Sequence, residues 1–171
     1  YGEGSQRLVA MNRYQGTLLW TRDAKYNFRH NAIVAGKGRV FCMDRMSAQR
    51  LSYLKRRGRS PSGNAHLCAL DLHTGDEIWR TEEHLFGTWL AYSTAHDLLL
   101  QAGSMNRDRA KDEAGRGMAV YRAGSGDVVW KSDVSYSGPP LLHGDLIITQ
   151  GKAFHLRTGK PHLRIHPLTG V

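Results

Sequence analysis

The densest group of charged side chains in the sequence is a basic segment, RMSAQRLSYLKRRGRSPSG, at residues 45–63. It contains no acidic residue, and its cations are Arg45, Arg50, Lys55, Arg56, Arg57 and Arg59. Guanidinium and ammonium groups gathered in this way suit an anionic partner, such as nucleic acid, a phospholipid headgroup or an acidic polysaccharide. The alternative interpretation is a solvated, mobile loop that binds nothing.

The other side chains able to do chemistry are dispersed. The nine histidines show no metal-ligand spacing. His162 and His166 are four residues apart, but Pro161 and Pro167 flank them, which disfavours a helix presenting both. A second charged insertion, residues 105–117, has nearly balanced charges and is predicted to be a short helix or a solvated loop.

Length and composition set the frame. The 171 residues suggest one domain, and 40% hydrophobic residues allow a packed core. The net charge of +9 is compatible with an anionic partner or simply with solubility. No apolar run approaches the roughly 20 residues that span a membrane. The chain starts at Tyr1 with no visible signal peptide, and its two cysteines are too few for a disulfide framework.

One layout occurs four times and must organise the rest of the chain. ALDLHTGDEIW (69–79) is repeated as AMNRYQGTLLW (10–20), VYRAGSGDVVW (120–130) and AFHLRTGKPHL (153–163). Each copy has alanine or valine six residues before a glycine, and three copies have tryptophan four residues after it. The glycines are Gly16, Gly75, Gly126 and Gly159, and the tryptophans are Trp20, Trp79 and Trp130.

A second pattern precedes the later copies of this motif. Residues 31–44, 92–104 and 137–151 each contain an apolar run, a tight turn and another apolar run. The turns fall at residues 36–38, 95–97 and 143–145, so each segment is predicted to be a β-hairpin. We align Val40 with Leu98 and Leu146 across the three hairpins.

Together the two patterns predict an all-β fold. Four short antiparallel strands with one aromatic signature describe a blade of a β-propeller. The predicted limits are a partial blade at 1–30, a blade at 31–91 with the basic insertion, a blade at 92–136 with the second insertion, and a partial blade at 137–171. Three to four blades do not close a ring, since propellers usually have about four to eight. We therefore expect part of a larger propeller.

The pattern A-x-D-x-x-T-G-x-x-x-W resembles the tryptophan-docking motif of pyrroloquinoline-quinone (PQQ)-like propeller repeats. Residues 69–79 match it at Ala69, Asp71, Thr74, Gly75 and Trp79. The resemblance implies that the motif tryptophans dock between neighbouring blades, with the motif glycines fixing the turns. Those residues are therefore expected to be structural, while Trp89 lies outside the motif and has an open role.

The same resemblance raises the question of a cofactor. Quinoprotein dehydrogenases of this class hold PQQ with Ca²⁺, bound by Glu, Asn and Asp side chains, often beneath a disulfide between adjacent cysteines. This sequence has no adjacent cysteines and no recognisable calcium-ligand motif. We therefore expect no catalytic residue and no metal site in this chain, and PQQ with Ca²⁺ only if it is a dehydrogenase segment.

The two cysteines flank the basic segment on strands expected to be neighbours. The hairpin alignment places Cys42 opposite Leu67 rather than Cys68, so the thiols should face opposite sides of the sheet. A disulfide between them is then disfavoured.

Three functions follow from these patterns. The leading one is a non-catalytic propeller scaffold for a protein or carbohydrate partner, joined to the remaining blades of the same polypeptide. It is similar in this to the bacterial outer-membrane assembly lipoproteins built from the same repeat, which implies an extracytoplasmic location. The alternatives are a segment of a PQQ-dependent alcohol or sugar dehydrogenase, and an anion-binding module that uses residues 45–63.

Overall fold

The computed structural model describes residues 4–61, 63, 65–103, 114 and 116–162. Twelve strands and one helix make up its regular structure, and all strand pairs are antiparallel. The predicted all-β class is confirmed. The chain divides into two compact units, with the boundary between Leu85 and Phe86.

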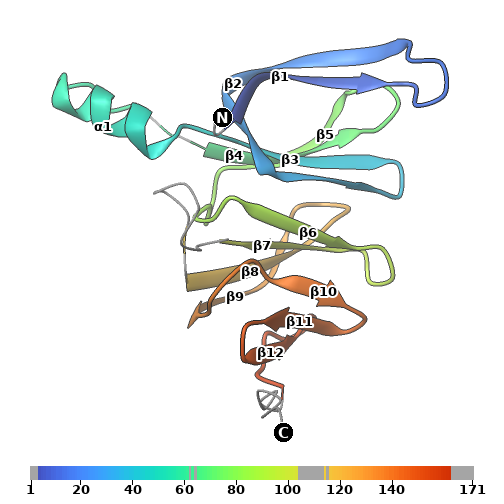
Figure 1. The fold of residues 1–171 in the computed structure, drawn as a ribbon, viewed down its shortest axis with the longest axis vertical. Helices are drawn as coiled ribbons and strands as arrows, with labels where there is room; N and C mark the ends of the chain where they lie inside the picture. Colours follow the sequence, from blue (N-terminus) through green and yellow to red (C-terminus); the bar gives the residue numbers. More distant parts are fainter. Residues whose placement is uncertain (1–3, 62, 64, 104–113, 115, 163–171) are drawn as a thin grey trace, which may run out of the picture. The chain divides into compact units, whose positions relative to one another are not determined.

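The first unit is one five-stranded sheet in the order β1-β2-β3-β4-β5 (Figure 1). Its elements are β1 (Gly4–Met11), β2 (Leu18–Gly36), β3 (Arg39–Arg45), helix α1 (Ala48–Arg56), β4 (Ala65–Asp71) and β5 (Glu77–Thr81). Strand β2 pairs with β1 through residues 18–29 and with β3 through residues 28–36. Its core contains Trp20, Phe28, Val40, Cys42, Cys68 and Leu70.

The second unit contains two sheets. The four-stranded sheet runs β6 (Trp89–Ser93), β7 (Leu98–Ala102), β8 (Arg116–Arg122) and β9 (Val128–Ser135). The three-stranded sheet runs β10 (Leu141–His143), β11 (Leu146–Thr149) and β12 (Lys152–His155). Both contribute to one core of Leu98, Leu100, Ala102, Met118, Val120, Tyr136, Ile147, Phe154 and Leu156, so the sheets pack face to face.

The three hairpins lie where the sequence predicts them. Lys37 and Gly38 turn the chain between β2 and β3 with φ of 47° and 71°. Asp97, at φ 53°, ends the turn between β6 and β7, and Gly144, at φ 55°, opens the turn between β10 and β11. Positive φ matches the right-handed twist of the flanking strands, which explains the glycine and aspartate in these turns.

The spacing within the repeated motif follows from strand pairing. In three copies the residue six before the glycine lies directly opposite the tryptophan: Ala10 with Trp20, Ala69 with Trp79, and Val120 with Trp130. A register irregularity follows at the same place in each copy. A small side chain is needed at this slot because the indole occupies the space across the strand pair.

The turn of the motif is also shared by all four copies. The glycine N–H donates to the carbonyl oxygen four residues earlier, at 2.8–2.9 Å, in the pairs Gly16–Asn12, Gly75–Asp71, Gly126–Arg122 and Gly159–His155. Each glycine has φ between 66° and 79°. Where Asn12 or Asp71 begins the turn, its side-chain oxygen also accepts two backbone N–H groups, which explains the aspartate of the motif.

The predicted relation of the two cysteines is wrong. Cys42 lies directly opposite Cys68 in the β3–β4 pair, and their sulfur atoms are 3.3 Å apart. In the structure, Arg39, Leu98 and Leu146 each pair with the residue that lies four positions before the motif glycine. The hairpin alignment used Val40 in place of Arg39, which is a slip of one residue. Because side chains alternate along a strand, a slip of one residue reverses the face of every side chain.

The contact between the motif glycine and a tryptophan gives a stability prediction. A Cβ added to Gly75 would lie 2.7 Å from the Trp20 ring, whereas one added to Gly16 would meet nothing within 4 Å. Alanine at either positive-φ site costs roughly 1–2 kcal/mol, and overpacking at Gly75 adds about 1–3 kcal/mol. Gly75→Ala should therefore lower the unfolding free energy measured in denaturant clearly more than its matched control Gly16→Ala. Equal losses in the two variants would contradict the contact.

Candidate functional site

Nine of the nineteen residues of the basic segment form helix α1, so the interpretation of the whole segment as a loop is wrong. The Ser47 hydroxyl accepts a hydrogen bond from the Arg50 N–H and caps the N-terminus of α1. Gly58, at φ 67°, and Arg59 close the other end through bonds to the Lys55 and Leu54 carbonyls. The serine before and the glycine after a run of good helix formers were the overlooked sequence signal.

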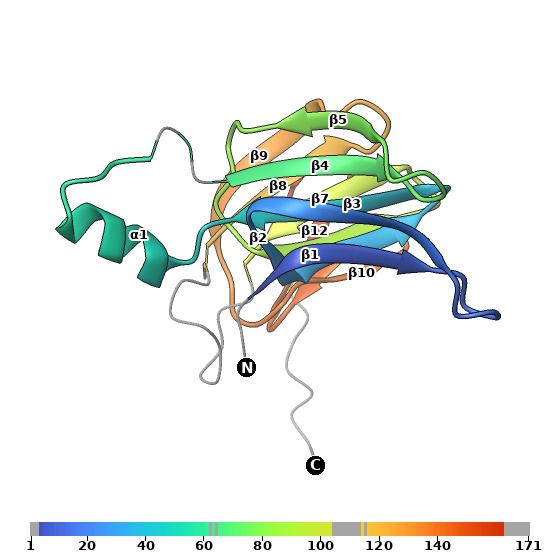
Figure 2. The same cartoon turned by 90° about the horizontal axis from the view of Figure 1, so that it is seen from above.

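Helix α1 stands off the sheet of its unit and buries none of its residues (Figure 2). Five cations of the basic segment are exposed: Arg50, Lys55, Arg56, Arg57 and Arg59. The sixth, Arg45, is half-buried at the end of β3. The Arg50 and Arg57 guanidinium groups lie over the Tyr53 ring, 5.4 and 4.7 Å from its centre. This arrangement places two guanidinium groups at one aromatic ring, which suits an anionic group.

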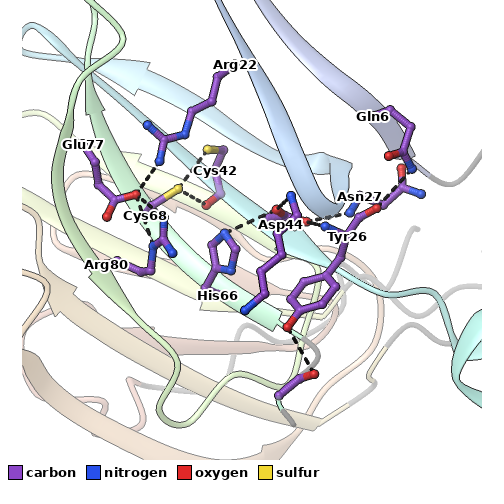
Figure 3. A network of polar contacts seen from close by, with 12 residues as sticks. Gln6, Arg22, Tyr26, Asn27, Cys42, Asp44, His66, Cys68, Glu77 and Arg80 are labelled. Carbon is purple, nitrogen blue, oxygen red and sulfur yellow. Dashed lines mark hydrogen bonds and ion pairs between the residues drawn. The ribbon is translucent and has the colours of Figure 1, made fainter. Parts of the chain in front are cut away.

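Next to this segment, a buried polar network joins β2, β3 and β4 (Figure 3). The Asp44 carboxylate, 1% exposed, accepts the backbone N–H groups of Lys25, Tyr26 and Asn27 at 2.6–2.8 Å. His66 Nε2 lies 3.3 Å from the same carboxylate. Residues 25–27 lie at an irregularity in the β1–β2 register, where their N–H groups have no regular cross-strand partner. Asp44 accepts hydrogen bonds from these N–H groups in place of that partner.

The charge state of Asp44 follows from these contacts. Burial alone would raise the pKa of the carboxyl group, but the hydrogen bonds from His66 and the three amides outweigh it, and the pKa lies below its usual range. His66 is itself 4% exposed, and its Nδ1 has no hydrogen-bond partner within the described residues. This network could not be predicted from the sequence because its members are far apart in the chain. An aspartate on the same strand face as Val40 and Cys42 was the available signal.

A polar cavity of about 420 Å³ lies between β1, β2 and the start of α1. Lys25 and Arg50 are its charged residues, and Gln6, Tyr26, Asn27, Met46 and Ser47 complete the lining. The arrangement can hold a small polar group, with cations from two different elements.

The motif tryptophans make equivalent contacts in the two units. Trp20 Nε1 donates to the Leu72 carbonyl at 2.9 Å, and Trp130 Nε1 donates to the Leu156 carbonyl at 2.7 Å. Each acceptor lies three residues before a motif glycine, and a Cβ on Gly75 or Gly159 would come within 2.7 Å of the indole. The Trp79 ring lies 6.1 Å from that of Phe41.

Two other aromatic and charged contacts accompany the tryptophans. Trp89, whose role the sequence left open, donates through Nε1 to the Pro140 carbonyl at 3.0 Å. Arg22 donates to the Gly75 carbonyl at 3.3 Å and pairs with Glu77, which also pairs with Arg80 (Figure 3). The Arg22 contacts connect β2 to the motif turn that receives Trp20.

An apolar groove of about 600 Å³ lies along the β1–β2 hairpin. Its lining includes Val9, Met11, Tyr14 and Leu19, whose exposed fractions are 48%, 56%, 83% and 49%. Since exposed apolar area concentrated in this way is typical of a docking surface, the groove is a second candidate site.

The histidines form pairs that the sequence did not predict. His155 and His162 lie with ring nitrogens 3.3 Å apart, and His96 Nε2 contacts the Asp145 carboxylate between two hairpin turns. Within the described residues, no group of three His, Cys, Asp or Glu side chains could hold a metal ion. Leu163 of the fourth motif copy, His166 and most of the second insertion lie outside the described residues.

The antiparallel meanders and their repeated tryptophan–glycine contacts define a β-propeller domain of the PQQ-like type. A family model described as "Outer membrane protein assembly factor BamB" matches residues 1–111, which is more than half of the chain. The chain therefore belongs to the PQQ-like repeat family. A comparison with curated protein sequences gives no match.

Solved structures share the fold. BamB from Moraxella catarrhalis has a TM-score of 0.60 at 17% identity, over 94% of this chain and 44% of that one. A europium-containing methanol dehydrogenase has a TM-score of 0.59 at 15% identity, over 92% and 38%. Quinohemoprotein alcohol dehydrogenase ADHIIG from Pseudomonas putida HK5 has a TM-score of 0.56 at 16% identity, over 91% and 31%. The chain thus spans less than half the length of each relative.

The described cavities do not fit a calcium-bound quinone. The polar cavity, the apolar groove and a smaller cavity of about 230 Å³ beside β12 have no Asp or Glu in their linings. Calcium takes about six to eight oxygen ligands, carboxylates prominent among them. No step of quinone chemistry is therefore assigned to these residues.

The Asp44 network predicts a pH dependence. Because the folded pKa lies below the unfolded value of about 3.9, the carboxylate stabilises the fold above that pH, and the contribution is lost as pH falls through the folded pKa. Asp44→Asn should lower the unfolding free energy by about 2–3 kcal/mol at neutral pH. The difference in unfolding free energy between this variant and the unmodified chain should become smaller below about pH 4.

Denaturant titrations from pH 3 to pH 7 would measure this difference. Asp23→Asn is the matched control, because Asp23 is an exposed aspartate paired with Arg7 at the surface. It should change the unfolding free energy little. If the loss of unfolding free energy in Asp44→Asn stayed constant down to pH 3, the ionised Asp44 carboxylate would not be what stabilises the fold.

Proposed function

We propose that the chain is part of a non-catalytic PQQ-like β-propeller that serves as a scaffold for a protein partner. The observation that carries this proposal is the use of the family signature residues. Trp20 and Trp130 donate their N–H groups to backbone carbonyls and pack against glycine turns. These packing contacts of the most regular side chains in the sequence support a scaffold role.

The first motif copy supports a larger propeller. Its turn has the same hydrogen bond and positive φ as the others, but a Cβ on Gly16 would meet nothing within 4 Å. The neighbouring Arg13 and Tyr14 line the apolar groove. In the proposal, a tryptophan-bearing strand from another blade of the same polypeptide covers this surface, as Trp20 covers Gly75.

The nature of the partner and the location follow from the relatives. The matching family model and one similar structure carry the name BamB, described as an outer membrane protein assembly factor. By analogy, the partner is a protein, with carbohydrate as the second option, and the location is extracytoplasmic, at the cell envelope. None of the helical residues that the structure describes forms a segment able to cross a membrane.

The dehydrogenase alternative gives a direct test. The full-length polypeptide would be incubated with PQQ and Ca²⁺, desalted, and assayed for dye-linked oxidation of ethanol and glucose. A scaffold should retain no quinone absorbance and show no turnover. Stoichiometric retention of quinone together with turnover would overturn the proposal and favour a quinoprotein dehydrogenase, for which PQQ with Ca²⁺ would be the cofactor.

A second candidate function is anion binding by the basic segment. It is favoured by the exposed cations of α1 and its flanks, which have no carboxylate among residues 45–63, and by the guanidinium groups around Tyr53. Among anionic partners, an acidic polysaccharide suits the proposed location. This surface could operate on the same scaffold.

Heparin, as a sulfated polysaccharide probe, would test this candidate. Replacing Lys55, Arg56, Arg57 and Arg59 with serine should weaken binding at least about tenfold near 0.1 M salt and flatten its salt dependence, because fewer counterions are released. The matched control removes four exposed cations elsewhere: Arg13, Arg122, Arg157 and Lys160. If both quadruple variants weaken binding equally, net charge rather than the basic segment is responsible, and this candidate fails.

A further inference from the structure

Cys42 and Cys68 form a matched pair of thiols in the middle of the first sheet (Figure 3). They lie directly opposite each other on antiparallel strands, and their sulfur atoms are 3.3 Å apart. Both are free cysteines, and they are 0% and 1% exposed. They are the only two cysteines in these 171 residues, so within them each thiol has one possible partner.

Strand geometry brings this pair within reach of a covalent bond. Residues directly opposite on antiparallel strands have Cα atoms about 4.5–5.5 Å apart, and disulfides span Cα distances of about 4.4–6.8 Å. A sulfur–sulfur bond is about 2.05 Å long, so closing the present gap needs side-chain rotation and little backbone movement. We propose that Cys42 and Cys68 are a disulfide site that links β3 to β4 when the chain folds under oxidising conditions.

The reaction is a thiol–disulfide exchange with a small or protein disulfide as the oxidant. One cysteine thiolate attacks the oxidant, forms a mixed disulfide and releases one thiolate. The other cysteine then attacks the sulfur of its partner, closes the Cys42–Cys68 bond and releases the second thiolate. The chain loses two electrons and two protons, and the oxidant is reduced to two thiols.

The surroundings decide when this reaction is possible. The hydrogen bond with Cys68, followed by burial, raises the pKa of the Cys42 thiol far above its usual range. Because the thiolate is the reacting species, a buried thiol with a raised pKa exchanges slowly. The bond therefore forms before β3 and β4 have closed over the sulfurs, and the folded sheet then preserves whichever redox state it received.

The position of the bond links it to the basic segment. The chain leaves the sheet after Arg45 and returns at Ala65, and these two residues are paired partners. A Cys42–Cys68 bond would close this excursion covalently three pairs further into the sheet. The base of the basic segment would then stay fixed even if the ends of β3 and β4 separate.

Oxidative refolding of the 171-residue chain tests the proposal. Reduced, unfolded chain would be diluted into reduced and oxidised glutathione, quenched with acid, unfolded, alkylated and weighed by mass spectrometry. The expected product is a monomer lighter by two hydrogen atoms that takes up no alkylating reagent. Two alkylated thiols, glutathione adducts or cross-linked dimers as the main product would overturn the proposal.

Two further measurements separate the fit of the bond from its mere formation. The folded, reduced chain placed in the same glutathione buffer should oxidise at least tenfold more slowly than the refolding chain. The oxidised chain should also unfold at a higher denaturant concentration than the reduced chain, whereas Cys42→Ser/Cys68→Ser should be insensitive to reductant. If the folded and the refolding chain were oxidised at equal rates, the thiols would not be protected by the fold. If the oxidised chain unfolded at a lower denaturant concentration than the reduced chain, the bond would not fit the native sheet.

Discussion

The packing of an indole ring against a glycine turn is the contact on which the architecture depends. The turn needs positive φ, which glycine adopts without strain, and the surface of the turn must lack a Cβ for the ring to approach. The carbonyl three residues before the glycine accepts the indole N–H, so burying the ring leaves no donor unsatisfied. The same combination joins Trp20 to Gly75 in the first unit and Trp130 to Gly159 in the second, which explains why glycine and tryptophan recur from copy to copy.

Strand β2 shows how one chain segment serves two pairings. Its first part pairs with β1 and its second part with β3, and residues 25–27, at the register irregularity of the β1–β2 pair, have amides that the ladder does not use. A buried carboxylate is unfavourable unless its oxygens are fully hydrogen-bonded. The three amides and His66 provide those bonds for Asp44, so the irregular stretch and the buried charge stabilise each other.

The sequence was most informative where structure is local. Turn residues predicted the hairpins, since a hairpin depends on contacts a few residues apart. It failed where one residue changes the outcome: aligning Val40 instead of Arg39 with Leu98 placed the two thiols on opposite faces. It also gave no access to Asp44 and His66, because their contacts join residues about 20 positions apart and depend on tertiary folding. Helix α1 was not predicted, although Ser47 before it and Gly58 after it are typical helix-end residues.

The attachment of the basic segment has an energetic consequence. It leaves and rejoins the sheet through one paired position, Arg45 with Ala65, and its helix contributes no buried residue. Lengthening a surface connection costs little, with each doubling worth only about 0.6 kcal/mol. The excursion can therefore be lengthened or shortened at little energetic cost to the sheet, so the surface chemistry it carries is separable from the scaffold.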